Sequence, residues 1–162
     1  MKNVKYTKWQ LFSLVLLRVF IGWHFLYEGV IKLYNPSWTA KSYLLTSQGF
    51  MKSFYVWMAG DSYISVVDTI MVAGLLVVGV GLMAGIMTRW VAVAGSIILL
   101  LLYLAHPALP GLSSGLSAGN YWLINNNLIE IAALMVIYQF PVSYYFSLEF
   151  IFKKEKSTEQ TV

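Results

Sequence analysis

The sequence contains no cysteine and few charged residues. Its 162 residues include no Cys, 11 Lys and Arg, and 7 Asp and Glu. The absence of Cys excludes disulfide bonds, thiol relays, Cys-ligated iron–sulfur clusters and c-type haem attachment. Charged residues make up 11% of the chain, whereas ordinary soluble domains have about 25%. The composition therefore argues against a soluble domain.

The hydrophobic residues are arranged in long continuous segments. Hydrophobic residues make up 59% of the chain, and a helix needs about 20 apolar residues to cross a bilayer core. We predict four spans, at residues 10–33, 62–87, 89–105 and 122–140, with a tight antiparallel hairpin between the second and third. The predicted fold class is an all-α polytopic membrane protein, a four-helix transmembrane bundle.

One domain accounts for almost the whole chain. We predict a single four-span domain over residues 1–152 and a charged cytoplasmic tail over residues 153–162. Residues 142–152 are too few to span a bilayer and carry aromatic residues, so we expect an interfacial helix there. The first apolar segment has no small-residue cleavage site after it, which indicates a retained helix.

Lys and Arg residues predict the orientation. They gather on one side of a four-span chain: Lys2, Lys5 and Lys8, Arg89 in the hairpin turn, and Lys153, Lys154 and Lys156. Because Lys- and Arg-rich loops stay cytoplasmic, both termini are predicted to lie inside, in the bacterial cytoplasmic (inner) membrane.

The two outer loops differ in composition. Residues 34–61 are rich in aromatic side chains and are expected to lie in the headgroup layer or to fold over the mouth of the bundle. Residues 107–121 are rich in Gly, Ser and Pro and are expected to be irregular and mobile.

The first span carries four ionisable residues, Arg18, His24, Glu28 and Lys32. An Arg, Lys or Asp at the centre of a membrane helix costs about 2.5–3.5 kcal/mol on insertion scales, so such groups are expected to pair or to line a site. At about 100° per residue, Arg18 and Lys32 share a face with small residues, and His24, Glu28 and Lys32 form an adjoining stripe.

Further polar residues are expected on the other spans. We predict an ion pair between Arg18 and Glu130, since the helical rise places them within about 6 Å of axial depth. Asp68 is expected near the depth of Glu28, and His106 closes the third span. The three residues Asn125, Asn126 and Asn127 enter the fourth span on the same, outer side.

Three motifs resemble the DoxX/DoxD family of four-helix membrane proteins. They are LRVFIGWHFLYEGVIKL, GLLVVGVGLMAGIMTRWVAVAG and NNLIEIAAL, and the first places Arg18, Gly22, Phe25, Gly29 and Lys32 at the family spacing. DoxD-like proteins are membrane subunits of thiosulfate:quinone oxidoreductase, and distant animal relatives assist receptor assembly. The resemblance thus implies a redox-linked membrane protein, while His24, Glu28 and Asp68 lie outside the matched motif.

The leading functional hypothesis is a quinone-interacting membrane component of an oxidoreductase, with thiosulfate as a candidate donor. A quinone headgroup needs a hydrogen bond at each carbonyl, and its reduction needs two protons, which a His and a carboxylate can supply. The candidate catalytic residues are His24, Glu28 and Asp68. The candidate residues for binding the quinone cofactor, ubiquinone or menaquinone, are Arg18, Lys32, His106, Asn127 and Glu130.

Structural interpretations of the same residues remain open. An Arg18–Glu130 pair could serve only to fix helix register, and Lys32 and His24 could simply neutralise the neighbouring acids. Haem bound by His24 and His106 is disfavoured because their depths differ, and zinc bound by His24, Glu28 and Asp68 is disfavoured as well. We expect no metal, haem or iron–sulfur site.

Two other function classes remain. One is a non-enzymatic scaffold or assembly factor that binds a partner helix or a lipid, and the other is a small-anion transporter. The chain is expected to lie in the lipid bilayer and to bind no nucleic acid. The candidate partners are a second membrane or periplasmic subunit and a second copy of the chain.

Overall fold

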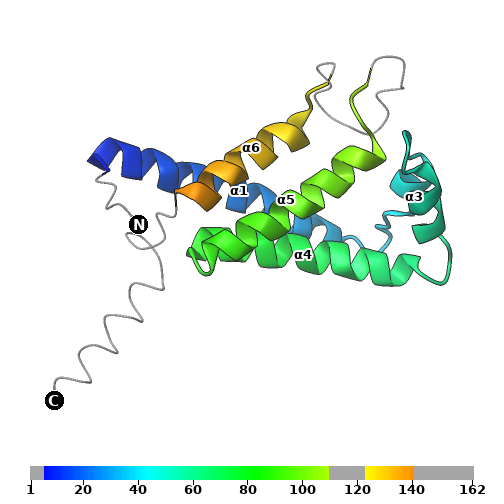
Figure 1. The fold of residues 1–162 in the computed structure, drawn as a ribbon. Coiled ribbons are helices and arrows are strands. Elements are labelled where there is room, and N and C mark those ends of the chain that lie inside the picture. Colours follow the sequence, from blue (N-terminus) through cyan, green and yellow to red (C-terminus); the bar gives the residue numbers. More distant parts are fainter. Residues whose placement is uncertain (1–5, 110–122, 141–162) are drawn as a thin grey trace.

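The described part of the chain is entirely helical. The computed structural model describes residues 6–109 and 123–140. Its helices are α1 (Lys8–Tyr34), α2 (Lys41–Leu45), α3 (Lys52–Met58), α4 (Ile64–Ala84), α5 (Thr88–Ala105) and α6 (Asn126–Gln139). α1 and α4 run lengthwise through the molecule, α5 and α6 run obliquely to them, and α2 and α3 lie together at one end (Figure 1). The predicted all-α class is confirmed.

Three of the predicted spans are helices that are long and apolar enough to cross a membrane. These are α1, α4 and α5, and each agrees with its predicted span to within a few residues at either end. The fourth, α6, has 14 residues and is shorter than the roughly 20 that cross a bilayer core. It begins at Asn126 because the Asn125 side chain accepts a hydrogen bond from the Leu128 amide and caps the helix.

The turn between α4 and α5 is as short as the sequence indicated. Gly85 ends α4 in the left-handed conformation, with φ at 70°, and its amide bonds back to the carbonyls of Gly81 and Leu82. A glycine adopts this conformation without a steric penalty, so it stops the helix sharply. Since α5 begins at Thr88, the two helices form a tight antiparallel hairpin.

Glycines let α1 and α4 approach closely. A Cβ added at Gly79 would lie 2.5 Å from the Leu26 backbone nitrogen, and one added at Gly22 or Gly29 would lie 2.9 Å from a side-chain carbon of α4. Small residues at a helix interface favour such packing within membranes. The helices are antiparallel, because Gly22 contacts Met83 whereas Gly29 contacts Leu76.

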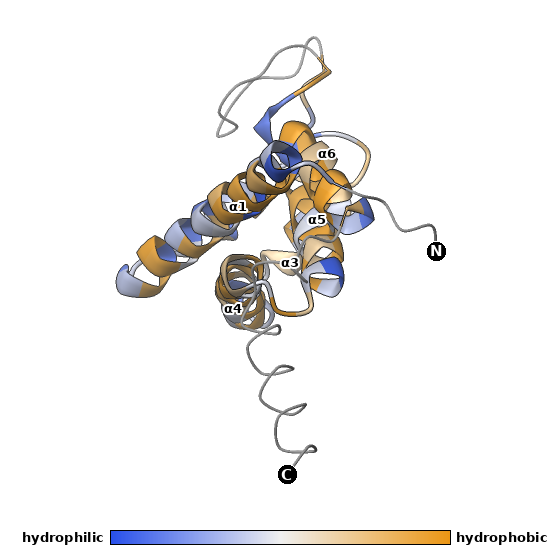
Figure 2. Cartoon of the chain, turned by 90° about the vertical axis from the view of Figure 1, so that its left-hand side faces the viewer, coloured by the Kyte–Doolittle hydropathy of each residue, from blue (hydrophilic) through white to orange (hydrophobic). Residues whose placement is uncertain are grey.

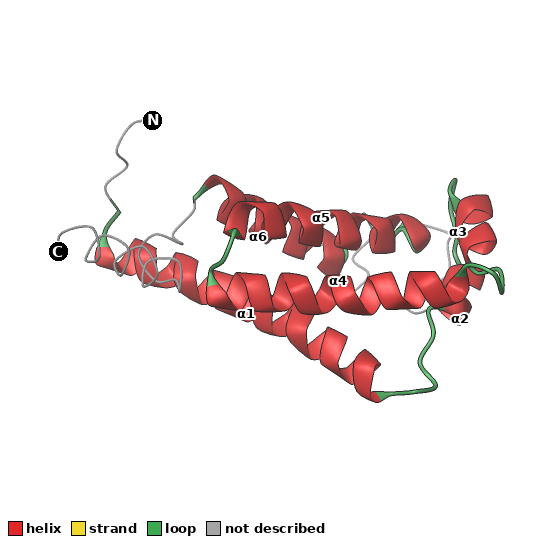
Figure 3. Cartoon of the chain, turned by 90° about the horizontal axis from the view of Figure 1, so that it is seen from below, coloured by secondary structure: helices red, strands yellow, loops and turns green. Residues whose placement is uncertain are grey.

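The main core lies where all four longer helices meet. Its buried residues are Ile21, Phe25, Leu75, Val78, Leu82, Ala92, Leu99, Leu134 and Ile137. α1 packs mainly on α4, and α6 mainly on α5, an arrangement visible from below in Figure 3. Apolar residues cover much of the outer surface of α5 and α6, whereas hydrophilic residues interrupt α1 (Figure 2).

A second core forms where residues 35–63 fold over one end of the helices. It contains Ala40, Leu44 and Tyr55 from this segment and Ala105 from the end of α5. We call this segment, residues 35–63, the cap. The structure shows the segment folded over the end of the bundle, which is one of the two positions expected for it.

Two sequence predictions fall on residues outside the described ranges. These are the interfacial helix at residues 142–152 and nearly all of the Gly-, Ser- and Pro-rich loop at residues 107–121.

The α1–α4 contact yields a first prediction. Gly79→Ala forces the backbones of α1 and α4 apart, and we expect a loss of about 1–3 kcal/mol in the free energy of unfolding in detergent. Gly74→Ala is the matched control, because its Cβ would meet only the terminal carbon of Ile98, 3.0 Å away. Equal losses in the two variants would contradict the proposed close approach.

Candidate functional site

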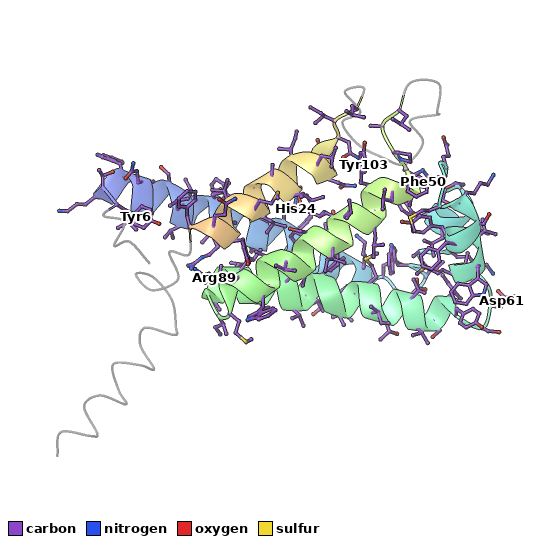
Figure 4. The ribbon with its side chains drawn as sticks, in the orientation of Figure 1. Tyr6, His24, Phe50, Asp61, Arg89 and Tyr103 are labelled. Atoms are coloured by element: carbon purple, nitrogen blue, oxygen red, sulfur yellow. The ribbon has the colours of Figure 1, made fainter. Side chains whose placement is uncertain are left out.

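The central polar contact joins α1 to α6. His24 Nδ1 lies 3.1 Å from Glu130 Oε1, with the His24 side chain 53% exposed and that of Glu130 18% exposed. His24 lies midway along the molecule, where α6 passes in front of α1 (Figure 4). We call this pair the His24–Glu130 site.

The predicted Arg18–Glu130 ion pair is wrong, since Glu130 pairs with His24 instead. Arg18 lies six residues before His24 on α1. At 1.5 Å per residue, this places Arg18 about 9 Å along the helix from the residue that contacts Glu130.

A second ion pair continues the polar stripe of α1. Lys32 donates to the carboxylate of Glu28 one turn away, and its Nζ also lies 5.6 Å from the centre of the Trp38 ring. Lys32 therefore neutralises Glu28 and connects the stripe to the start of the cap. This is the structural role that the sequence left open for Lys32.

The His24–Glu130 site retains unused hydrogen-bonding capacity. Glu130 Oε2 is buried and has no hydrogen-bond partner within residues 6–109 and 123–140. The imidazole has a second nitrogen, Nε2, on a side chain that is half exposed. A ligand between α1 and α6 could thus meet one carboxyl oxygen and one ring nitrogen.

Asn127 shares the α6 face of Glu130, whereas Arg18 lies far from it. Asn127 precedes Glu130 by three residues, so the two side chains lie on the same side of the helix. Arg18 is fully buried, but it precedes His24 by six residues, which is about 9 Å along α1. Of these two predicted cofactor ligands, only Asn127 has a position next to the site.

Asp68 lies outside the site, and its predicted depth is wrong. The antiparallel register that pairs Gly29 with Leu76 places Asp68 level with position 37, beyond the end of α1. Asp68 Oδ1 accepts a hydrogen bond of 2.8 Å from the Ala40 amide, at the start of α2. The carboxylate therefore holds the cap on α4, at a distance from Glu28.

His106 also attaches the cap to the bundle. It follows the last residue of α5, and its Nε2 hydrogen bonds to the Tyr43 carbonyl over 2.9 Å. The two rings pack edge to face with centroids 4.3 Å apart. His106 is buried, so it serves the attachment of α2 to α5 and does not face His24.

Sequence reasoning missed two tyrosines that complete this attachment. Tyr43 donates its hydroxyl to the Leu102 carbonyl over 2.9 Å, and Tyr55 donates to the Leu101 carbonyl over 2.8 Å. These carbonyls lie in the last turn of α5, and the Leu102 carbonyl also accepts a hydrogen bond from the His106 amide. No local sequence pattern predicts these contacts, because Tyr43 and Leu102 are 59 positions apart and Tyr55 and Leu101 are 46 positions apart.

A metal centre finds no support in the described part of the chain. Within it, no three His, Asp or Glu side chains lie together in a way that could hold an ion. His24 and His106 have different partners, Glu130 and Tyr43.

Comparison with known proteins gives one match. The family model described as DoxX matches residues 13–107, which include α1 from its second turn, the cap, α4 and α5. No curated protein and no solved structure matches the chain. The match leaves out α6, and with it Asn127 and Glu130.

The His24–Glu130 contact yields a second prediction. A double-mutant cycle of His24→Ala and Glu130→Ala should give a coupling of about 0.6–1.7 kcal/mol in the free energy of unfolding in mixed micelles. These values are the average and the maximum for polar pairs between membrane helices. The control cycle, Glu28→Ala with Lys32→Ala, should give about 0.2–0.5 kcal/mol, as expected for a pair within one helix. Additive effects of the first two changes would contradict the contact.

The cap yields a third prediction, on alkaline pH. Burial, and secondarily the neighbouring Tyr55, raises the pKa of Tyr43 to about 12, whereas an unfolded tyrosine has a pKa of about 10. The folded chain therefore keeps a proton that the unfolded chain releases. The contribution of Tyr43 to the free energy of unfolding is therefore complete below about pH 10, and it is lost as the pH rises toward about 12.

Tyrosinate absorbance measures this directly. Subtracting the titration of Tyr43→Phe from that of the unaltered chain should isolate one phenol that titrates near pH 12. A difference curve centred at pH 10 would mean that the Tyr43 hydroxyl is not buried against α5.

Proposed function

The chain belongs to the DoxX family, and on this premise we propose that it is a quinone-interacting integral membrane component of an oxidoreductase. The observation that supports this most is the His24–Glu130 pair, which bridges α1 and α6 at mid-length of an apolar bundle. Polar pairs at such depth are expensive and are typical of functional sites.

The proposal includes four spans with both termini in the cytoplasm of a bacterium. α6 lies alongside α5 and is taken as the fourth span. Lys8 and Arg89 lie at the proposed cytoplasmic end. In the sequence, seven Lys and Arg residues belong to the proposed cytoplasmic side, against Lys32, Lys41 and Lys52 at the other end. This excess supports the assignment of the other end to the outside.

The chemistry of the site suits a quinone headgroup. A quinone supplies a two-electron, two-proton acceptor that is soluble in the bilayer. His24 would bind one carbonyl oxygen through Nε2, and Glu130 Oε2 would hold a proton at the other. Asn127 offers an amide on the same face of α6, and Glu28 with Lys32 adds a neutral pair next to the site.

The half-exposed side of His24 supports access from the lipid. A bilayer-soluble ligand reaches an intramembrane site through a gap between helices, and α1 and α6 make fewer contacts with each other than with their main partners. Electrons would come from an outer donor, for which thiosulfate is the candidate, or from a partner subunit. Asp68 and His106 have structural roles in the cap under this proposal.

The decisive experiment measures quinone retention and reduction in nanodiscs. We expect the purified chain to retain extractable quinone, and Glu130→Gln and His24→Ala to retain at least tenfold less. Asp61→Asn is the matched control, because this carboxylate is exposed and lies at the far end of the molecule (Figure 4). Donor-dependent reduction, followed by ultraviolet absorbance, should fall in the same two variants.

Each result separates the proposal from its alternative. Retention that is unaffected by Glu130→Gln and His24→Ala would place any quinone elsewhere. If the unaltered chain retains no quinone but copurifies with one stoichiometric membrane protein, the scaffold function would replace the redox function.

A further inference from the structure

The outer face of α3 presents a continuous aromatic surface. Trp57 is 56% exposed, and Phe54 and Tyr63 are exposed as well. Phe54 stacks on Trp57 with ring centroids 6.1 Å apart, and Trp57 contacts Tyr63 with centroids 4.6 Å apart. We call Phe54, Trp57 and Tyr63 the α3 surface, and we propose that it binds the phospholipid headgroup layer of the bilayer that holds the helices.

The direction of α3 fits this position. α1 and α4 run lengthwise through the bundle and α5 and α6 run obliquely to them, whereas α3 runs across α4 at the end of the molecule (Figure 1). The view from below agrees, because α3 is seen there nearly end-on (Figure 3). If the longer helices cross the membrane, α3 lies close to the membrane plane, as interfacial helices do.

The opposite face of α3 is fixed to the protein. Tyr55 and Ala59 are buried in the second core, and the Tyr55 hydroxyl is bonded to the Leu101 carbonyl. Because successive residues of a helix project about 100° apart, burying Tyr55 and Ala59 turns Phe54 and Trp57 outward. The aromatic side chains are thus held on the outside by the packing of the other face.

The continuity of the surface identifies lipid as its occupant. Tyr63 directly precedes α4, whose outward residues Val66 and Ile70 are exposed and apolar. These residues face acyl chains if α4 spans the bilayer, so the α3 surface begins where the acyl region ends. Trp and Tyr are enriched at that boundary, where an aromatic ring meets apolar chains and its polar atom meets water or headgroups.

The charges around the α3 surface suit phosphate groups. Lys52, at the start of α3, is exposed. Lys41 forms an ion pair of 2.5 Å with Asp61 and contributes no net charge. The cap therefore presents one uncompensated cation beside aromatic rings, a combination that fits a layer of zwitterionic or anionic phosphate headgroups.

Tryptophan fluorescence tests the proposal in phosphatidylcholine nanodiscs. A chain that keeps Trp57 and has its other five tryptophans replaced by Phe reports on this surface alone. We expect at least twofold stronger quenching by lipids labelled near the headgroup than by lipids labelled at the acyl-chain end, and little quenching by aqueous iodide. The control chain keeps only Trp38, which is partly buried and contacts Lys32, and should show little quenching by either.

Two outcomes would overturn the proposal. Iodide quenching of Trp57 without lipid quenching would place the surface in water. Protection from both quenchers would mean that protein covers it. Because five substitutions can unfold the chain, the difference signal between the unaltered chain and Trp57→Phe provides the same measurement with one substitution.

Discussion

The neutralisation of charge inside an apolar bundle is the constraint on which the rest of this structure depends. α1 carries Glu28, Lys32 and His24 within a helix able to cross a membrane. Lys32 satisfies Glu28 within the helix, but His24 finds its partner on α6. The bundle must therefore hold α6 against α1 at the depth that brings Glu130 to His24.

Close packing of small residues makes that arrangement possible. Glycines bring α1 and α4 into close contact. Gly22 and Gly29 of α1 lie against residues of α4, and Gly79 of α4 lies against the backbone of α1. α4 continues through a glycine turn into α5, and α6 packs on α5. The position of Glu130 relative to His24 is thus set by a chain of three helix contacts, each with its own register.

The two groups of polar residues in this protein have different tasks. One group bridges α1 and α6 and keeps a buried carboxyl oxygen without a described partner, which suits a ligand. The other group forms hydrogen bonds with backbone atoms of the cap and α5, and its members are Asp68, His106, Tyr43 and Tyr55. An ordered cap in turn holds the α3 surface at the end of the molecule.

The sequence by itself determined the helical class, the bounds of α1, α4 and α5, and the stripe of ionisable residues on α1, because apolar length and helical periodicity are local properties. It also placed Asn127 and Glu130 on the helix that follows. Only the tertiary structure decided that Glu130 pairs with His24 and not Arg18, and that Asp68 holds the cap. Axial depth depends on where a helix begins and on its register against its neighbours, and both are set by contacts between residues that are distant in sequence.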